Sequence, residues 1–213
     1  KSFSKPNCLS QMLVKSCDVR SEKKQKTLNL SVNFTMAWSE SFAAQIDEKT
    51  QVLILGSMPG VKSLQENQYY AHKRNAFWPI MQSHFAIDAT ADYRQRLIEL
   101  QRQHIGLWDV YGRCYRPGSL DSNIDKSRSQ LNDFVALLEQ CSNIHAIFFN
   151  GKAAETAFLK AVKPLLQQSL SAQRFDSLLL QGLPSTSPAN AAMSFEQKLV
   201  KWQVVKEVLY REA

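Results

Sequence analysis

The amino-acid sequence predicts an α/β fold: a three-layer sandwich in which helices flank a central four-stranded, mostly parallel sheet. Short apolar runs of strand length alternate with longer segments of helical spacing from about residue 50 onward. This alternation is typical of parallel strands covered on both faces. The hydrophobic fraction of 44% is that of an ordinary globular protein. No apolar run approaches the roughly 18 residues of a membrane-spanning helix, so no membrane segment is expected.

The first half of the chain is expected to contain two strands and three helices. Helical patterns occur at residues 38–46, 76–85 and 93–101. The continuous apolar run at 52–56 predicts a buried strand, and residues 105–110 predict a second one.

The second half repeats the alternation. Leu131, Phe134, Val135 and Leu138 recur at helical spacing and predict an amphipathic helix. Strands are expected at 144–149 and 178–183, with a helix over 152–166 between them. Ser194 with Gln197 three residues later predicts a capping box, which opens a last helix running to about residue 210.

Charge is concentrated at the beginning of the chain, which suggests two parts. Residues 1–35 contain seven Lys/Arg and two Asp/Glu, a balance of +5, whereas the other residues contain 19 and 17, a balance of +2. We expect a basic polar extension over 1–35 and a single α/β domain over 36–213. The extension is either sequence upstream of a natural start at Met36 or, less in keeping with the pattern, a basic DNA-binding tail.

The four cysteines, Cys8, Cys17, Cys114 and Cys141, form no C-x-x-C pair and have no histidine at ligand spacing. Zinc or iron–sulfur ligation is therefore not expected, and no metal site is predicted. Isolated thiols of this kind suit a reducing cytoplasm.

Ligands of parallel α/β sheets bind beyond the carboxyl ends of the strands. Here those ends are residues 56–60, 110–117, 150–152 and 184–190, which are all rich in Gly, Pro, Ser, Thr or Asn. The sequence therefore predicts a site where these loops meet.

Two segments carry the chemistry that such a site needs. The GSMPG turn at 56–60 allows close approach of backbone N–H groups to a ligand, although a plain tight turn has the same composition. The segment YYAHKRNAFW at 69–78 combines aromatic faces, cations and an amide, which suits a flipped nucleobase and its flanking phosphates. Phe77 and Trp78 could instead be core residues, and Asn75 could be a helix N-cap, an active residue or both. His72 is given no catalytic role.

Two further strand ends have open interpretations. Asp109 could accept hydrogen bonds from a ligand, pair with Arg113 or cap a turn. The loop LPSTSPAN at 183–190 suits phosphate contacts, although a rigid linker would look similar.

In order, these segments resemble the uracil-DNA glycosylase superfamily, and most closely its hypoxanthine-DNA glycosylase branch. The resemblance covers about residues 52–192. It rests on five motifs: LILGSMPG, YYAHKRNAFW, GLWDVYGRCYRPGSLDSNI, FNGK and LPSTSPAN.

The chain also departs from the pattern of several branches. Met58 stands where many relatives have Asp or Asn, and it offers no acid or base. Leu183 stands where many have His or Asn before Pro-Ser. The hypoxanthine branch shares both differences and relies on an asparagine in the second segment, which the resemblance identifies as Asn75.

The resemblance implies a monofunctional DNA glycosylase of base excision repair. Such an enzyme hydrolyses the N-glycosidic bond of deaminated bases, hypoxanthine first and uracil or xanthine as further substrates, and leaves an abasic site. We expect a monomer that acts on DNA in the bacterial cytoplasm, at the nucleoid, without a cofactor. The alternatives are a uracil or mismatch thymine glycosylase, a catalytically weak DNA-damage binding protein, and a nucleoside or nucleotide hydrolase.

The implied site has three parts, with Asn75 as its catalytic residue. Its base pocket is expected to comprise Gly56, Ser57, Met58, Pro59, Gly60, Tyr69, Tyr70, Phe77, Trp108, Asp109 and Asn150. Its DNA-binding residues are expected to be Lys73, Arg74, Lys152, Ser185, Thr186, Ser187, Pro188 and Ala189.

Overall fold

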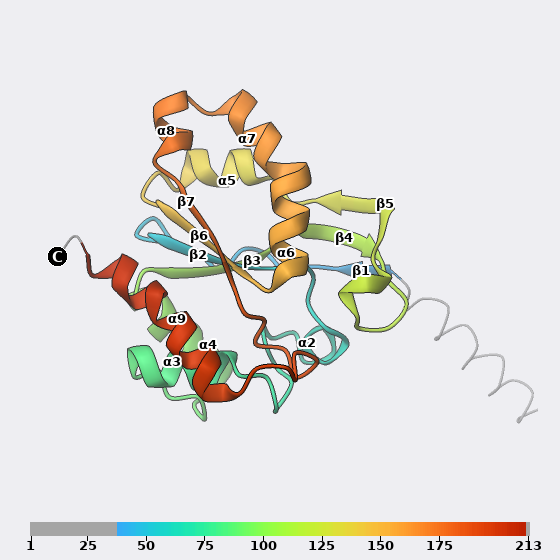
Figure 1. Cartoon of the computed structure of the whole chain (residues 1–213), viewed down its shortest axis with the longest axis vertical. Coiled ribbons are helices and arrows are strands. Elements are labelled where there is room, and N and C mark those ends of the chain that lie inside the picture. Colours follow the sequence, from blue (N-terminus) through green and yellow to red (C-terminus); the bar gives the residue numbers. More distant parts are fainter. Residues whose placement is uncertain (1–37, 212–213) are drawn as a thin grey trace, which may run out of the picture. The chain divides into compact units, whose positions relative to one another are not determined.

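A four-stranded parallel sheet forms the centre of the protein (Figure 1). The computed structural model describes residues 38–211, so the predicted extension and the boundary at residue 36 lie outside the described residues. The strand order is β3 (Ile105–Asp109), β2 (Val52–Gly56), β6 (Ala146–Asn150) and β7 (Leu179–Leu183). All three neighbouring pairs are parallel, which confirms the predicted sheet.

Helices cover both faces of this sheet, as predicted (Figure 1). One face is covered by α3 (Phe77–Phe85), α4 (Tyr93–Arg102) and α9 (Phe195–Leu209). Side chains of alternate strand residues, including Val52 and Ile54, pack against these helices. Because successive side chains of a strand point to opposite faces, Leu53 and Leu55 pack on the other side.

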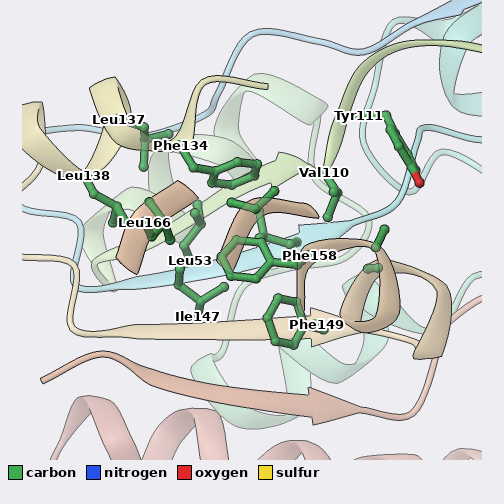
Figure 2. Packing of buried hydrophobic residues seen from close by; sticks show 14 of the residues in the cluster. Leu53, Val110, Tyr111, Phe134, Leu137, Leu138, Ile147, Phe149, Phe158 and Leu166 are labelled. Carbon is green, nitrogen blue, oxygen red and sulfur yellow. The ribbon is translucent and has the colours of Figure 1, made fainter. Parts of the chain in front are cut away.

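The second face carries α5 (Phe134–Gln140), α6 (Lys152–Ala157), α7 (Lys163–Ser169) and α8 (Ala172–Asp176). Figure 2 shows the core beneath them, where Leu53 and Phe149 from the sheet meet Phe134 and Phe158. The predicted helix over 152–166 runs through α6, a π-helical turn (Phe158–Val162) and α7. The turn precedes Pro164, whose ring and missing N–H disfavour a regular α-helix at that point.

A smaller antiparallel sheet, in the order β1–β4–β5, was not predicted. Its strands are β1 (Trp38–Glu40), β4 (Tyr111–Tyr115) and β5 (Asp125–Leu131). The predicted helix over 38–46 is wrong, because the backbone of its first residues pairs with β4. The expected loop over 110–117 is mostly this strand.

The helix predicted around Leu131 begins later than expected. Leu131 ends β5, and α5 begins at Phe134 after Asp133, whose side chain accepts the N–H of Ala136. The capping box that opens α9 is confirmed, with both Ser194–Gln197 hydrogen bonds present. Within residues 38–211, no helix has the length and apolar character needed to cross a membrane.

The register brings the carboxyl ends of the central strands together. Gly56 at the end of β2 lies beside Asp109 at the end of β3, and Asn150 lies beside Leu183. The loops that follow therefore meet at one edge of the sheet. The short helix α2 (Val61–Glu66) and a 3₁₀ turn (Asp121–Asn123) also lie in these connections.

Candidate active site

A cavity of about 290 Å³ lies at the carboxyl edge of the central sheet. It brings together most of the residues that the sequence assigned to the site: Gly56, Ser57, Met58, Pro59, Gly60, Tyr69, Tyr70, Asn75, Asp109, Asn150, Ser185, Thr186, Ser187, Pro188 and Ala189. These residues come from segments up to 133 positions apart (residue 56 to residue 189), and the parallel strand ends are what collect them. The geometry is that of one concave site.

The Gly56–Gly60 turn forms one wall and is held by a buried arginine. Arg116 is fully buried, and its guanidinium donates to the carbonyl oxygens of Met58 and Pro59, at 3.4 and 2.5 Å. It also lies 3.8 Å from the carboxylate of Asp121. The Met58 side chain is 6% exposed and belongs to the core beneath α5 and α6. The turn therefore offers the cavity a fixed backbone.

Asp109 is a buried carboxyl group at the end of β3. The Ser41 hydroxyl donates to its Oδ2 at 2.8 Å. Its Oδ1 lies so close to Gly56 that a Cβ at position 56 would collide with it, which explains the glycine. Burial raises the pKa of Asp109 to about 7, although the bond from Ser41 acts in the opposite direction. The alternative of an Asp109–Arg113 pair is wrong, since Arg113 pairs with Glu40 at 3.5 Å.

Tyr69 and Tyr70 contribute aromatic rings to the cavity. Tyr69 is held by its backbone, whose N–H donates to the Tyr93 hydroxyl and whose carbonyl accepts from the Trp78 indole. Tyr70 adopts a positive φ of 57° and stacks on Phe77, with ring centroids 4.0 Å apart. Phe77 itself is fully buried among core aromatics and does not line the cavity.

Asn75 lies beside the beginning of α3 and at the cavity, and its catalytic role stays a prediction. Its Oδ1 accepts the backbone N–H of Phe77 at 3.0 Å, next to the beginning of α3. The formal N-cap position is Ala76, whose N–H donates to the carbonyl of Thr186. Asn75 also lines the cavity. Because the amide oxygen is used at the helix, the amide NH₂ group is the part left to meet a ligand.

The loop at 184–190 is fixed from several sides. Asn150 and Thr186 exchange two hydrogen bonds, from Nδ2 to the hydroxyl at 2.9 Å and from the Thr186 N–H to Oδ1 at 2.8 Å. Gly151 has a φ of 102°, and a Cβ there would lie 2.8 Å from the Cβ of Ser185. The indole of Trp202 donates to the carbonyl of Pro184 at 3.0 Å. Asn150 thus positions this loop.

Four other predicted residues lie away from the cavity wall. Lys73 and Arg74 are exposed between His72 and Asn75, which do line it. Lys152 is exposed at the start of α6 and pairs with Glu155 at 3.0 Å. Trp108 packs on Phe134 and donates to a backbone carbonyl, so its ring belongs to the core side of the sheet.

Several cavity residues were missed by the sequence analysis. They are Val61, Lys62 and Ser63 on α2, His72 in the loop before Asn75, and Ser119, Leu120 and Asp121 in the connection after β4. Polar loop residues of this kind have no pattern that distinguishes them from other loops. Val61 and Leu120 are the apolar members of this set, and Leu120 is 56% exposed.

Among residues 38–211, no three His, Cys, Asp or Glu side chains gather closely enough to hold a metal ion. Cys114 and Cys141 are buried free thiols. The cavity offers two carboxyl groups, phenols, hydroxyls and amides, together with the His72 imidazole and the Lys62 amino group.

Comparisons with known proteins agree on one family. The family model of the uracil DNA glycosylase superfamily matches residues 43–208. A hypoxanthine DNA glycosylase of Methanosarcina acetivorans is 34% identical over 166 residues, which cover 77% of this chain and 95% of the relative. A hypoxanthine DNA glycosylase of Methanosarcina barkeri is 40% identical over 114 residues, 53% of this chain and 71% of the relative.

A solved structure gives the same result. The solution NMR structure of a candidate uracil DNA glycosylase from Methanosarcina acetivorans has a TM-score of 0.66 and 32% sequence identity. The match covers 81% of this chain and 98% of that chain.

Proposed function

The chain belongs to the uracil DNA glycosylase superfamily, and from this membership we propose that it removes hypoxanthine from deoxyinosine in DNA. It is a DNA glycosylase that acts on deaminated bases. The observation that carries the proposal is the cavity in which the Asn75 amide faces a pocket walled by Tyr69 and Tyr70. Relatives named hypoxanthine DNA glycosylase support the choice of base.

The size of the cavity suits one flipped base. At about 290 Å³ it lies at the small end of ligand pockets, which begin near 300 Å³. A base within a duplex cannot reach such a pocket, so the nucleotide has to leave the stack first. A deaminated base pairs weakly, which lowers the cost of this step. The pocket takes the base, and the sugar and phosphates remain at its mouth.

In the proposed reaction, the bond between C1′ of the sugar and the base nitrogen breaks, and its electron pair leaves with the base. Water adds to C1′, and its proton is released. Asn75 cannot deprotonate water, but its NH₂ group can donate a hydrogen bond at the reacting centre. A preorganised donor of this kind stabilises the charge that develops in the transition state. Met58 contributes no acid or base, so the GSMPG turn acts through its backbone.

The proposed enzyme uses water and leaves the DNA strand uncut. Lys62 lies at the cavity, but its amino group is engaged in an ion pair with Glu66 of the same helix, at 2.5 Å. We therefore expect no Schiff base with the sugar. Borohydride should trap no covalent protein–DNA adduct, and a trapped adduct would contradict this part of the proposal.

We propose that DNA phosphates are bound around the mouth of the cavity. Lys73 and Arg74 are exposed next to the residues that line it, and Lys152 is exposed on α6. The fixed loop at 184–190 presents Ser185 and Ser187 beside the pocket. Cations and hydroxyls of this kind position a nucleic-acid backbone without recognising its sequence. The proposed enzyme works as a monomer, since one chain supplies the whole cavity, and acts in the cytoplasm, where bacterial DNA lies.

The test is one incubation with duplexes that contain deoxyinosine, deoxyuridine or deoxyxanthosine, followed by alkaline cleavage at abasic sites. We expect release from deoxyinosine, with less release from the other two. Release mainly from deoxyuridine would replace the proposal with a uracil glycosylase. Binding to damaged duplex without release from any of the three would identify a damage-binding protein instead.

A further inference from the structure

Leu120 lies at the cavity and is 56% exposed. Among the described residues that line this cavity, no other large hydrophobic side chain is more than a third exposed: Met58 and Tyr69, for example, are buried. The loop at 184–190 brings only prolines, hydroxyl-bearing residues and Ala189 to the cavity. Leu120 therefore presents apolar surface beside the proposed site, and a bound partner would remove that surface from water.

The connection after β4 that carries Leu120 is held by hydrogen bonds on both sides of the leucine. Before it, the Ser119 hydroxyl accepts the backbone N–H of Val61 at 3.1 Å. After it, the Asn123 side-chain amide donates to the carbonyl of Pro117 at 3.0 Å, which closes the connection on itself. A side chain presented by a loop that is already ordered loses less conformational entropy when it meets a partner.

Removal of a base from the stack leaves an empty space in the duplex. The cavity of about 290 Å³ takes a single base, so the nucleotide has to leave the stack to reach it. The neighbouring base pairs then have no partner on one face. DNA-binding proteins insert apolar side chains, leucine among them, between base steps that they hold unstacked. Leu120 has the size, the apolar character and the exposure for this role.

We propose that Leu120 enters the base stack and fills the space that the flipped nucleotide leaves. This inference rests on the proposed glycosylase function and adds to it the residue that holds the duplex open. The neighbouring Asp121 carboxylate lies 3.8 Å from the buried Arg116 guanidinium, which offsets the repulsion between this carboxylate and the DNA. Insertion stabilises the flipped state, so it contributes only where the base is extruded from paired DNA.

The test compares deoxyinosine in a paired duplex with deoxyinosine in single-stranded DNA of the same sequence. The readout is the ratio of the two single-turnover rates of base release, duplex over single strand. We expect Leu120→Ala to lower this ratio about 10-fold, because the variant lacks apolar carbons that the base stack would bury. Leu120→Met keeps an unbranched apolar side chain of similar volume and should restore most of the ratio.

A second readout follows the base stack directly. The fluorescent base 2-aminopurine is quenched when it is stacked, so it is placed in the duplex next to the deoxyinosine. Wild-type protein should raise its fluorescence before the base is released, and Leu120→Ala should raise it less. This readout decides the test if single-stranded DNA is not a substrate of the wild type.

Leu165→Ala is the matched control. Leu165 is a leucine on α7 that is 47% exposed and does not line the cavity. The variant loses the same apolar carbons from the surface of the protein, and its rates and fluorescence should equal those of wild type.

The outcomes separate the proposed function from this inference. Wild-type protein that releases no base from any deaminated duplex contradicts the proposed function, and with it the role of Leu120. If the wild type releases hypoxanthine and Leu120→Ala leaves both the ratio and the fluorescence unchanged, only the inference is overturned. Rates that fall equally on duplex and single strand would also overturn it, because Leu120 would then contact the base and not the duplex.

Discussion

The Gly56–Gly60 turn and the Tyr69–Trp78 segment both line the cavity, but they contribute different things. The turn contributes backbone: Met58 is buried in the core, and Arg116 holds two of the carbonyl groups. The segment contributes side chains, of which Tyr69, Tyr70 and Asn75 line the cavity. The first is fixed by a buried guanidinium and by backbone hydrogen bonds to Gly56 and Ser57. The second is fixed by aromatic packing and by a hydrogen bond at the beginning of a helix.

The difference shows that a site can keep its shape while the functional side chains lie on another segment. Met58 cannot act as an acid or base, yet the turn still closes the cavity. Substitutions in the two regions should therefore have different consequences. Changes in the segment should lower the rate with little loss of stability, and changes that free the turn should mainly lower stability.

Asn75→Ala gives the largest effect expected. We expect the single-turnover rate of base release to fall by about 10²–10⁴, the range for one removed catalytic donor. Stability should fall by only about 1 kcal/mol, because one hydrogen bond near the end of a helix is lost. Rates come from rapid mixing with excess protein, and stability from denaturant midpoints.

Asn143→Ala is the control for this substitution. Asn143 likewise makes one side-chain hydrogen bond, which its amide donates to the carbonyl of Glu48, and it does not line the cavity. Its rate should equal that of wild type. If the Asn75→Ala variant releases the base at a rate within a few-fold of wild type, the Tyr69–Trp78 segment does not supply the catalytic side chain.

The pH dependence of stability tests the buried carboxyl group that both regions surround. Burial raises the pKa of Asp109 from an ordinary value of 3.8 to about 7. Between these values the folded protein keeps a proton that the unfolded chain releases, so this group lowers the unfolding free energy as pH rises. Below pH 3.8 it has no effect, and above about 7 the loss is complete.

Asp109→Asn removes this contribution. Relative to wild type, the variant should become more stable as pH increases from about 4.5 to 7.5, by about 3 kcal/mol. Denaturant midpoints at several pH values measure the difference. A constant difference between the two proteins across this range would show that Asp109 titrates normally.

Arg116→Met tests whether the buried Arg116 side chain holds the Gly56–Gly60 turn in place. It leaves the carbonyl groups of Met58 and Pro59 without their donor, and we expect the unfolding free energy to fall by about 2–3 kcal/mol. Arg113→Met is the control, because Arg113 is half exposed and forms an ion pair with Glu40. It should cost about 1 kcal/mol or less. Equal losses in the two variants would show that Arg116 does not hold the turn.

The central sheet could be predicted from the sequence because its signals are local. Runs such as Val52–Gly56 are continuously apolar, and Ser194 and Gln197 form their capping box within four residues. The small sheet could not be predicted in this way. Ser39 pairs with Cys114, 75 residues later in the chain, and neither strand has an apolar alternation that marks it. Its stability comes from pairing between distant segments.

The site was partly predictable for a related reason. Parallel strands place their carboxyl ends at one edge, so the order of the elements along the chain was enough to bring Gly56, Asp109 and Asn150 together. Arg116 was missed, because an arginine before Pro-Gly normally predicts an exposed loop. Its burial depends on hydrogen bonds to carbonyl groups 57 and 58 positions away. No local sequence pattern indicates these contacts.

Met58→Leu is expected to have the smallest effect on rate and stability. It tests whether the Gly56–Gly60 turn contributes to the site through its backbone alone. Met58 packs in the core with 6% of its surface exposed, and leucine has a similar volume, so stability should change by less than about 1.5 kcal/mol. Because the side chain has no acid, base or strong hydrogen-bond group, the rate of base release should stay within about 3-fold of wild type. Both are measured as for Asn75→Ala, on the same duplex. A loss of 10²-fold or more with stability intact would mean that the turn acts through its side chain, and the division between backbone and side-chain contributions would fail.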